Sequence, residues 1–341
     1  MSKPILRKLA MALLPLTLLL LLLEGVFRLL PQPAEFPEAA YKDTYSFSTL
    51  FIPHPYCAFA PNPDHPAFYG HGLREDRELL LDSPHYRIIC MGGSATYGSR
   101  VERQDAFPAQ LEQVLKGRGK DVEVLNAGVH AYSTANIIGW LSLRMIDLHP
   151  KMVIFYVGFN DVFNWVNFSG FMSDYSHAQK SWQMPDLAAP FWTHSALLRR
   201  LTHWRPPLVH IHAVAFKKFS EDYAANLQAA DPDVFSRNLI TLAAICRGHG
   251  AIPVFALEAT DFGGHAEGSK EGARAFVQGM AEADQAMADA AARASVDRIY
   301  TASLNNQPND FADFIHLNEN GNRKLAEIMA NAIAGKLPDA P

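Results

Sequence analysis

The chain has 341 residues, of which 49% are hydrophobic and 19% are charged. These proportions are typical of a packed globular protein and exclude bulk disorder. Thirty Lys and Arg residues against 35 Asp and Glu residues give a formal net charge of −5, so the chain lacks the basic field that nucleic-acid binding requires. Three cysteines, Cys57, Cys90 and Cys246, are too few for a disulfide scaffold and too scattered for a zinc site.

The first predicted element is an apolar helix at the amino terminus. Three basic residues precede an uncharged, leucine-rich run over 9–23, and extending the helix to Leu30 gives 22 residues. At about 1.5 Å per residue this helix is about 33 Å long, which is enough to cross a bilayer. The basic residues are Lys3, Arg7 and Lys8. We therefore predict a cytoplasmic tail and a transmembrane signal-anchor helix over residues 1–30.

The flanking residues predict how this segment is processed and oriented. Glu24-Gly-Val-Phe follows the run, so no small-x-small cleavage site is present and an uncleaved anchor is favoured. Glu24 and Arg28 are four residues apart and can pair on one helix face. The basic residues predict a cytoplasmic amino terminus, with the rest of the chain periplasmic or extracellular. The membrane is then a predicted partner.

Residues 31–85 are predicted to form a proline-rich tether and amino-terminal extension lying extended over the surface. From residue 86 to 337, short apolar runs alternate with helical patterns. Strands are expected at 87–91, 122–125, 152–157, 252–257 and 298–300, and helices at 105–117, 134–147, 233–248, 270–294 and 319–335. This alternation predicts an α/β fold, with a central parallel sheet covered by helices on both faces.

An insertion over 162–232 interrupts the alternation and is too long for a plain loop. It holds four of the five tryptophans, namely Trp165, Trp182, Trp192 and Trp204. Three interpretations stay open for its aromatic residues: a hydrophobic core, a lid over an acyl chain, or a stacking platform for sugars. The first must hold for some of them.

Polar residues follow three of the predicted strands. The first strand runs into Gly92-Gly-Ser94, a turn that places Ser94 where helix N–H groups can stabilise an oxyanion, although a phosphate-binding turn or a plain helix cap fits equally well. The second runs into Asn126-Ala-Gly128 and the third into Gly158-Phe-Asn160. Because the carboxyl ends of parallel strands share one sheet edge, the Gly128 N–H and the Asn160 amide could donate to one oxygen there.

Asp313-Phe-Ile-His316 stands just before the last predicted helix. The spacing lets the Asp313 carboxylate bond the His316 ring within one turn. That bond fixes the tautomer and leaves the other ring nitrogen to take a proton from a serine.

His210 and His212 alternate as a metal pair could, but without a third ligand we predict no metal site. His130 either touches a substrate or bonds backbone.

These blocks carry a family resemblance. The chain resembles the SGNH (GDSL-like) hydrolase superfamily, in its membrane-anchored group, through four blocks in order over about 86–335: Gly92-Gly-Ser94, Asn126-Ala-Gly128, Gly158-Phe-Asn160-Asp161 and Asp313-Phe-Ile-His316. Four ordered blocks are far more specific than any one of them. The chain departs from the pattern at Gly93, where many members carry aspartate, and the insertion matches no shared block.

The resemblance implies a flavodoxin-like three-layer α/β/α sandwich and a set of catalytic roles. Ser94 would attack an acyl carbonyl, His316 would remove its proton, and Asp313 would orient His316. The N–H groups of Ser94 and Gly128, with the Asn160 side chain, would form the oxyanion hole. The chemistry needs no metal or other cofactor.

The leading hypothesis is therefore a serine esterase acting through an acyl-enzyme on an ester substrate, with the acyl group carried by an envelope glycan or lipid. An O-acyltransferase that moves an acetyl group to a polysaccharide hydroxyl would use the same residues. A non-catalytic glycan-binding protein on the same fold is the alternative from another class, although a binder has no need for the complete set of residues.

Overall fold

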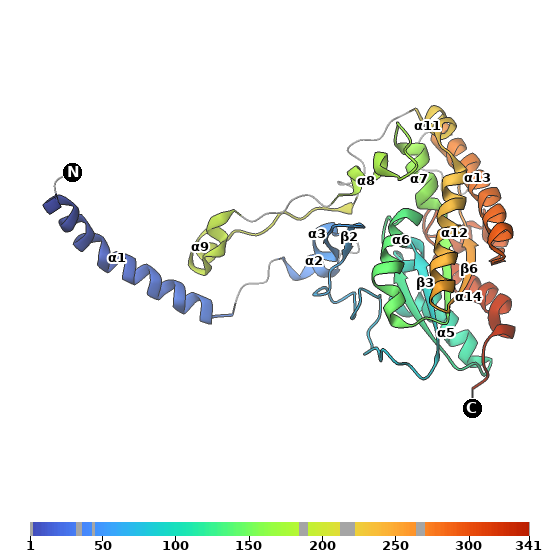
Figure 1. The fold of residues 1–341 in the computed structure, drawn as a ribbon, viewed down its shortest axis with the longest axis horizontal. Coiled ribbons are helices and arrows are strands. Elements are labelled where there is room, and N and C mark those ends of the chain that lie inside the picture. The colour runs from blue at the N-terminus through green and yellow to red at the C-terminus, as the bar shows by residue number, and fades with distance from the viewer. Residues whose placement is uncertain are drawn as a thin grey trace.

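We describe the protein from a computed structural model that covers residues 3–31, 36–42, 45–183, 190–211, 222–263 and 270–340. Its centre is a parallel sheet, of which β3 and β6 are labelled in Figure 1, and the strand order is β4-β3-β5-β6-β7. The strands are β3 (Tyr86–Gly92), β4 (Val122–Gly128), β5 (Met152–Val157), β6 (Ile252–Leu257) and β7 (Asp297–Ile299). The three inner strands are apolar runs buried on both faces, as parallel strands require. The predicted central parallel sheet is confirmed.

Helices cover the two faces of this sheet and enclose two hydrophobic cores. One face packs against α5 (Phe107–Gly117) and α14 (Glu319–Ile333), and the other against α6 (Thr134–Leu143), α12 (Pro232–Gly248) and α13 (Lys270–Ala294). Two further helices begin at the carboxyl edge of the sheet, α4 (Ser94–Tyr97) and α7 (Phe159–Asn167). Short 3-10 helices complete the domain at Arg103–Asp105, Met145–Leu148, Ala302–Leu304, Pro308–Asp310 and Ala334–Lys336.

The register of the strands brings the predicted site blocks to one edge. Gly92, the last residue of β3, pairs with Gly128 of β4 on one side and with Tyr156 of β5 on the other. Val157, which ends β5, pairs with Leu257, which ends β6. The residues that follow these strand ends therefore emerge side by side.

The amino-terminal extension is part of the domain core. It forms α2 (Glu38–Lys42), α3 (Phe47–Leu50) and an antiparallel hairpin of β1 (Phe51–His54) and β2 (Ala58–Pro61). Phe47, Phe51 and Phe59 are fully buried, with ring centroids 4.8–5.3 Å apart. This stretch is therefore not the extended surface tether that its prolines suggested, because its aromatic residues have a core to fill. The predicted boundaries at 31–85 and 86–337 stay predictions.

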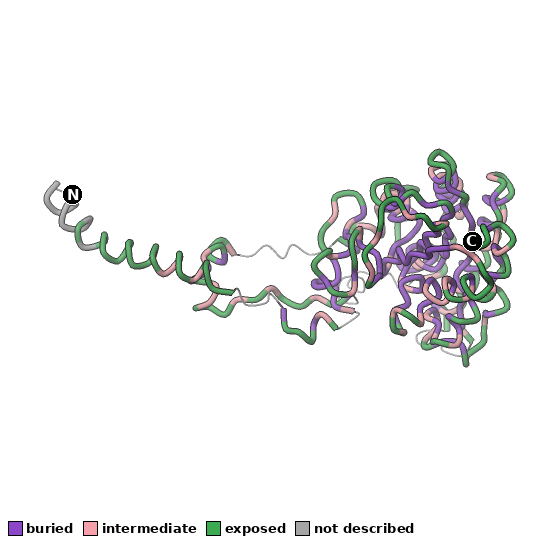
Figure 2. The backbone as a smooth tube through the Cα atoms, turned by 90° about the horizontal axis from the view of Figure 1, so that it is seen from below, coloured by how far each residue is buried: buried purple, intermediate pink, exposed green. Residues whose placement is uncertain are grey.

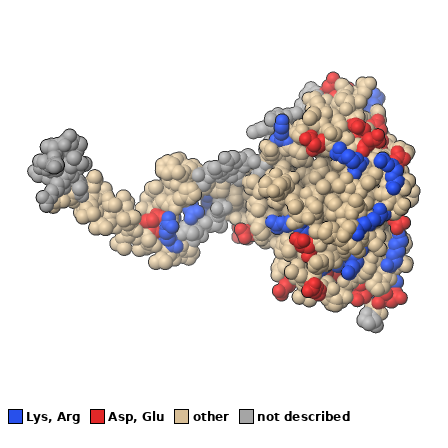
Figure 3. Space-filling model, in the orientation of Figure 1, with Lys and Arg blue, Asp and Glu red and all other residues tan. Residues whose placement is uncertain are grey.

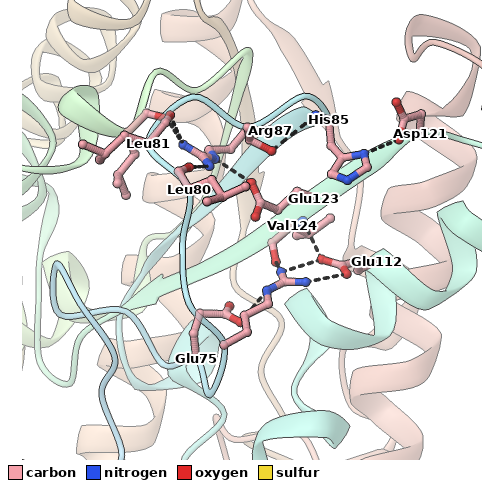
Figure 4. A network of polar contacts seen from close by, with 12 residues as sticks. Glu75, Leu80, Leu81, His85, Arg87, Glu112, Asp121, Glu123 and Val124 are labelled. Atoms are coloured by element: carbon pink, nitrogen blue, oxygen red, sulfur yellow. Dashed lines mark hydrogen bonds and ion pairs between the residues drawn. The ribbon is translucent and has the colours of Figure 1, made fainter.

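A buried ion-pair network fastens the following loop to the amino ends of β3 and β4 (Figure 4). Arg87 bonds Glu123 at 2.7 Å and donates to the carbonyl oxygens of Leu80 and Leu81. Arg77 makes a bidentate salt bridge with Glu112, with N–O distances of 2.8 and 2.9 Å. These arginine bonds replace regular secondary structure as the attachment of the loop.

The helix α1 (Lys3–Leu29) extends away from the domain, and most of its leucines are exposed where their side chains are described (Figure 2). In the part of the chain that the structure describes, no helix has the length and apolar character required to cross a membrane. The transmembrane helix predicted over residues 1–30 is therefore not supported. Glu24 and Arg28 do pair, at 2.7 Å, as their spacing suggested.

The insertion over 162–232 divides into two parts. Its first part continues α7 and adds α8 (Ser176–Trp182), with Trp165, Tyr175 and Trp182 buried in the domain core. Its second part holds a 3-10 turn at Phe191–His194 and α9 (Ala196–Thr202), which lies beside α1 away from the domain (Figure 1). The chain returns through α11 (Tyr223–Ala229). The core interpretation therefore holds for Trp165 and Trp182, whereas Trp192 is 39% exposed.

Candidate active site

Ser94 is held in a tight turn at the carboxyl end of β3. It is the first residue of α4, half-buried, and follows Gly93 at the N-cap. Its carbonyl oxygen accepts hydrogen bonds from the N–H of Gly98 at 2.9 Å and from both the N–H and the hydroxyl of Ser99, each at 3.2 Å. These bonds close the turn that carries Ser94.

His316 lies against that hydroxyl although 222 residues separate the two in the chain. Its Nε2 is 2.8 Å from the Ser94 Oγ. Its Nδ1 lies 2.8 and 3.0 Å from the two carboxylate oxygens of Asp313. A carboxylate on Nδ1 keeps the proton there, so Nε2 presents its lone pair to the serine. The structure thus brings together all three residues of the predicted catalytic set.

Besides the His316 ring, two backbone N–H groups hold the Asp313 carboxylate in place. This carboxylate accepts from the backbone N–H groups of Ile315 at 3.1 Å and His316 at 2.8 Å. Burial of the carboxyl favours its neutral form, but the bonds from His316 and the two amides outweigh this and hold the pKa of Asp313 below its ordinary value. A charged Asp313 stabilises a protonated His316 ring.

Asn160, the second residue of α7, lies next to the turn that carries Ser94. Its Nδ2 donates one hydrogen bond to the Tyr132 carbonyl at 3.0 Å. A Cβ atom at position 93 would collide with this Nδ2, which places the Asn160 amide against the backbone that leads into Ser94. The second N–H of the amide group remains available to an oxyanion.

Gly128 is placed differently from the prediction. It lies at the same sheet edge, packed so closely on α4 that a Cβ would clash with the backbone N of Tyr97. However, its N–H donates to Oδ1 of Asn126, two residues earlier, at 3.0 Å. In this structure the amide of Gly128 is therefore already bonded within the chain, to the side chain of Asn126.

Two further residues near the site, His130 and Asp161, bond to neighbouring side chains of the domain. His130 is buried, with Nε2 2.8 Å from the Ser99 Oγ and its ring 4.3 Å from that of Tyr97, so it packs against the turn that carries Ser94. Asp161 is buried and accepts from the N–H and hydroxyl of Thr134 at the start of α6. These bonds give Asp161 a local structural role.

One residue at the site escaped the sequence reasoning. Arg100, in the turn after α4, places its Nε 3.1 Å from Oδ2 of Asp313, and its guanidinium lies 5.0 Å from the centroid of the Tyr45 ring. The amino-terminal extension therefore reaches the edge of the triad. No spacing rule pairs an exposed arginine with an aspartate 213 residues away.

No group of three or more potential metal ligands occurs among the residues that the structure describes. Of the two histidines considered as a metal pair, His212 lies outside the described residues. His210 forms an isolated bridge with Ser46 of the amino-terminal extension. On the face shown in Figure 3, basic and acidic side chains are interspersed over the domain.

The sequence model of the GDSL-like lipase/acylhydrolase family matches residues 90–324, which is more than half of the chain and includes Ser94 and His316. The chain belongs to the GDSL-like lipase/acylhydrolase family. This confirms the superfamily suggested by the four sequence blocks. No curated protein matches the chain.

Solved structures similar to this GDSL-like protein share little sequence with it. A lipase/acylhydrolase from Enterococcus faecalis is 14% identical, with a TM-score of 0.46, and the match covers 75% of this chain and 98% of that one. A GDSL-like lipase from Bacteroides thetaiotaomicron is 14% identical, with a TM-score of 0.42, covering 74% and 89%. An acetyl xylan esterase is 16% identical, with a TM-score of 0.44, covering 72% and 99%.

Proposed function

We propose that this GDSL-like protein is a serine esterase that hydrolyses a carboxylic ester through an acyl-enzyme on Ser94. The observation that carries the proposal is the 2.8 Å approach of His316 Nε2 to Ser94 Oγ, with the Asp313 carboxylate on the opposite ring nitrogen. Nucleophile, base and orienting carboxylate in this geometry are the requirements of acyl transfer.

In the first step, the Ser94 oxygen bonds to the ester carbonyl carbon and its proton passes to His316 Nε2. The carbonyl oxygen becomes an oxyanion, which the Ser94 N–H and the second N–H of Asn160 Nδ2 stabilise. As the carbon–oxygen bond to the alcohol breaks, His316 returns the proton to the leaving oxygen. Gly128 joins the oxyanion donors only where its bond to Asn126 is exchanged for one to the substrate.

In the second step, a water molecule attacks the acyl-enzyme. His316 takes one proton from the water, the oxyanion forms again, and the bond to the Ser94 oxygen breaks as that oxygen regains a proton. The products are a carboxylic acid and free Ser94. Asp313 stays ionised throughout and stabilises the charged His316 ring each time it forms.

The test is hydrolysis of p-nitrophenyl acetate by wild-type protein and by Ser94→Ala and His316→Ala. We expect both substitutions to lower kcat by about 10³-fold or more, because they remove the nucleophile and its base. Circular dichroism spectra of both variants should match the wild type. Ser94→Ala protein that retains wild-type turnover would contradict the proposal.

We further propose that the domain lies outside the cytoplasm, where esters of envelope glycans or lipids are the available substrates. The support for this location is the order of Lys3, Arg7 and Lys8 before the leucine run, an order that secretory signal segments share. Protease added to intact cells after removal of any outer barrier should degrade the domain. Protection equal to that of a cytoplasmic marker protein would contradict this location.

A further inference from the structure

The helix that carries Asn160 cannot cap its own amino end. The N-cap of α7 is Gly158, which has no side chain to accept a bond from the first-turn N–H groups. No other residue fits there, because φ of Gly158 is 133° and an added Cβ would lie 2.6 Å from Cδ1 of Leu257. The first turn of α7 therefore needs an acceptor from another part of the chain.

Glu258 supplies that acceptor from the neighbouring strand. It follows β6 directly and is 3% exposed. Its backbone N–H donates to the Val157 carbonyl at 3.1 Å, and its Oε2 accepts the N–H of Phe159, the first residue of α7, at 2.7 Å. The acid group thus sits at the positive end of the helix, one residue before Asn160.

We propose that Glu258 is a positioning residue for Asn160, holding the first turn of α7 so that Nδ2 of Asn160 stays against the backbone of Gly93. Glu258 touches no reacting atom and acts through the helix. The inference rests on the proposed function, because it assigns Asn160 to the oxyanion.

Two ionisable groups face Glu258, Asp161 from α7 and Tyr156 from β5. Burial raises the pKa of Glu258 to about 8, and the nearby Asp161 carboxyl adds to this shift. Burial likewise raises the pKa of Asp161 to about 6. At neutral pH, Glu258 is therefore mainly a neutral acid whose Oε2 still accepts from Phe159. A glutamine side chain carries an equivalent acceptor at the same reach.

The test compares Glu258→Gln and Glu258→Leu with Asn160→Ala and with the double variant E258L/N160A, using p-nitrophenyl acetate. We expect E258L to lower kcat about 10-fold or more with KM within about 2-fold, and E258Q to stay within about 3-fold of wild type. N160A should lower kcat by about 10²–10³. The double variant should be no more than about 3-fold slower than N160A, because the two residues act through one interaction.

Glu123→Leu is the matched control, since it also removes a carboxylate from the sheet but at the opposite end, where it pairs with Arg87. It should lower the unfolding temperature and leave kcat near wild type. If E258L does not fold, as judged by circular dichroism, the smaller Glu258→Ala replaces it.

Two outcomes overturn the positioning role alone: unchanged kcat in E258L while N160A is slow, or losses that multiply in the double variant. Unchanged kcat in N160A would overturn the assignment of Asn160 to the oxyanion and the inference with it. Failure of Ser94→Ala to lose activity is a separate result, which overturns the proposed esterase function.

Discussion

At the scale of single residues, Gly93 shows how a departure from the family pattern is built into the site. Many GDSL-like proteins carry aspartate at this position, where this chain carries glycine. The structure adds a reason for glycine in this chain: a Cβ at position 93 would occupy the space of the Asn160 amide. The same position therefore controls the place of the Asn160 amide, which is one of the proposed oxyanion donors.

We predict that Gly93→Ala lowers kcat by about 10- to 100-fold, because it displaces Asn160 Nδ2 while Ser94 and His316 remain. Steady-state kinetics with p-nitrophenyl acetate measure the effect. Gly117→Ala is the control, since an added Cβ at the end of α5 meets no atom within 4 Å. Wild-type kcat in G93A would show that Asn160 does not need this space.

Arg100 should matter less than its contact with Asp313 suggests. We predict that Arg100→Met lowers kcat less than about 10-fold, because Asp313 keeps its bonds to the His316 ring and to two backbone amides, and an exposed ion pair contributes little. The arginine is 43% exposed. A loss in kcat above 100-fold would instead place Arg100 among the catalytic groups.

At the scale of elements, the two edges of the sheet have different roles. The carboxyl edge carries the candidate site, and the amino edge carries polar bonds that attach a loop. The carboxyl edge holds Ser94 and Asn160 on the first turns of α4 and α7. The amino edge holds the buried pair of Arg87 and Glu123 and attaches the loop before β3 (Figure 4). Stability and chemistry can therefore be perturbed separately.

We predict that Arg87→Leu lowers the free energy of unfolding by about 3–5 kcal/mol, because it leaves Glu123 buried without its partner and frees the loop carbonyls. Urea titration followed by circular dichroism measures this loss. The kcat of the folded fraction should stay near wild type. A loss below 1 kcal/mol would mean that the pair contributes little to the fold.

The sequence predicted the elements whose signals are local. Each inner strand is a continuous apolar run, and the Asp313–His316 spacing needs only one turn. It missed what depends on contacts across the chain. The prolines of the amino-terminal extension hid Phe47, Phe51 and Phe59, whose burial requires the finished domain. The bond from the Gly128 N–H to Asn126 and the cap from Glu258 depend on side-chain geometry that no spacing pattern reveals.

At the scale of the whole molecule, the α/β domain and the pair of helices α1 and α9 contribute unequally to the hydrophobic core and to the site. The domain contains both hydrophobic cores, and the extension from Phe47 onward belongs to it. The α1 helix contacts α9 through Glu24, which accepts from the Ser195 hydroxyl at 2.7 Å and from the Ala196 and Leu197 amides. Neither helix supplies a residue to the triad.

We predict that deletion of residues 1–31 leaves kcat within about 3-fold of wild type, because none of the side chains described in that segment belongs to a hydrophobic core. Deletion of residues 1–62 should prevent folding, since three fully buried phenylalanines are lost. Yield of soluble protein and its circular dichroism spectrum measure both effects. A folded, active 63–341 fragment would contradict the place given to the extension.

We predict that ionisation of Glu258 contributes to the pH dependence of the free energy of unfolding. Its pKa rises from 4.5 to about 8 on burial, so the folded state binds this proton more tightly than the unfolded state. The resulting stability is fully present below pH 4.5 and is lost as the pH rises through about 8. Glu258→Gln cannot titrate, and it should therefore gain stability relative to wild type between pH 5 and pH 9. Urea unfolding at both pH values measures this, with the exposed Glu271→Gln as control. Parallel pH profiles for E258Q and wild type would contradict it.

The central claim is that Ser94 is the nucleophile of an esterase, and labelling tests it most directly. Wild-type protein is treated with a fluorophosphonate, digested and mapped by mass spectrometry, beside Ser94→Ala and His316→Ala. We predict one stoichiometric adduct on Ser94, no adduct in S94A, and labelling slowed by about 10³-fold or more in H316A. Absence of labelling in folded wild-type protein, or an adduct on another residue that persists in S94A, would contradict the claim.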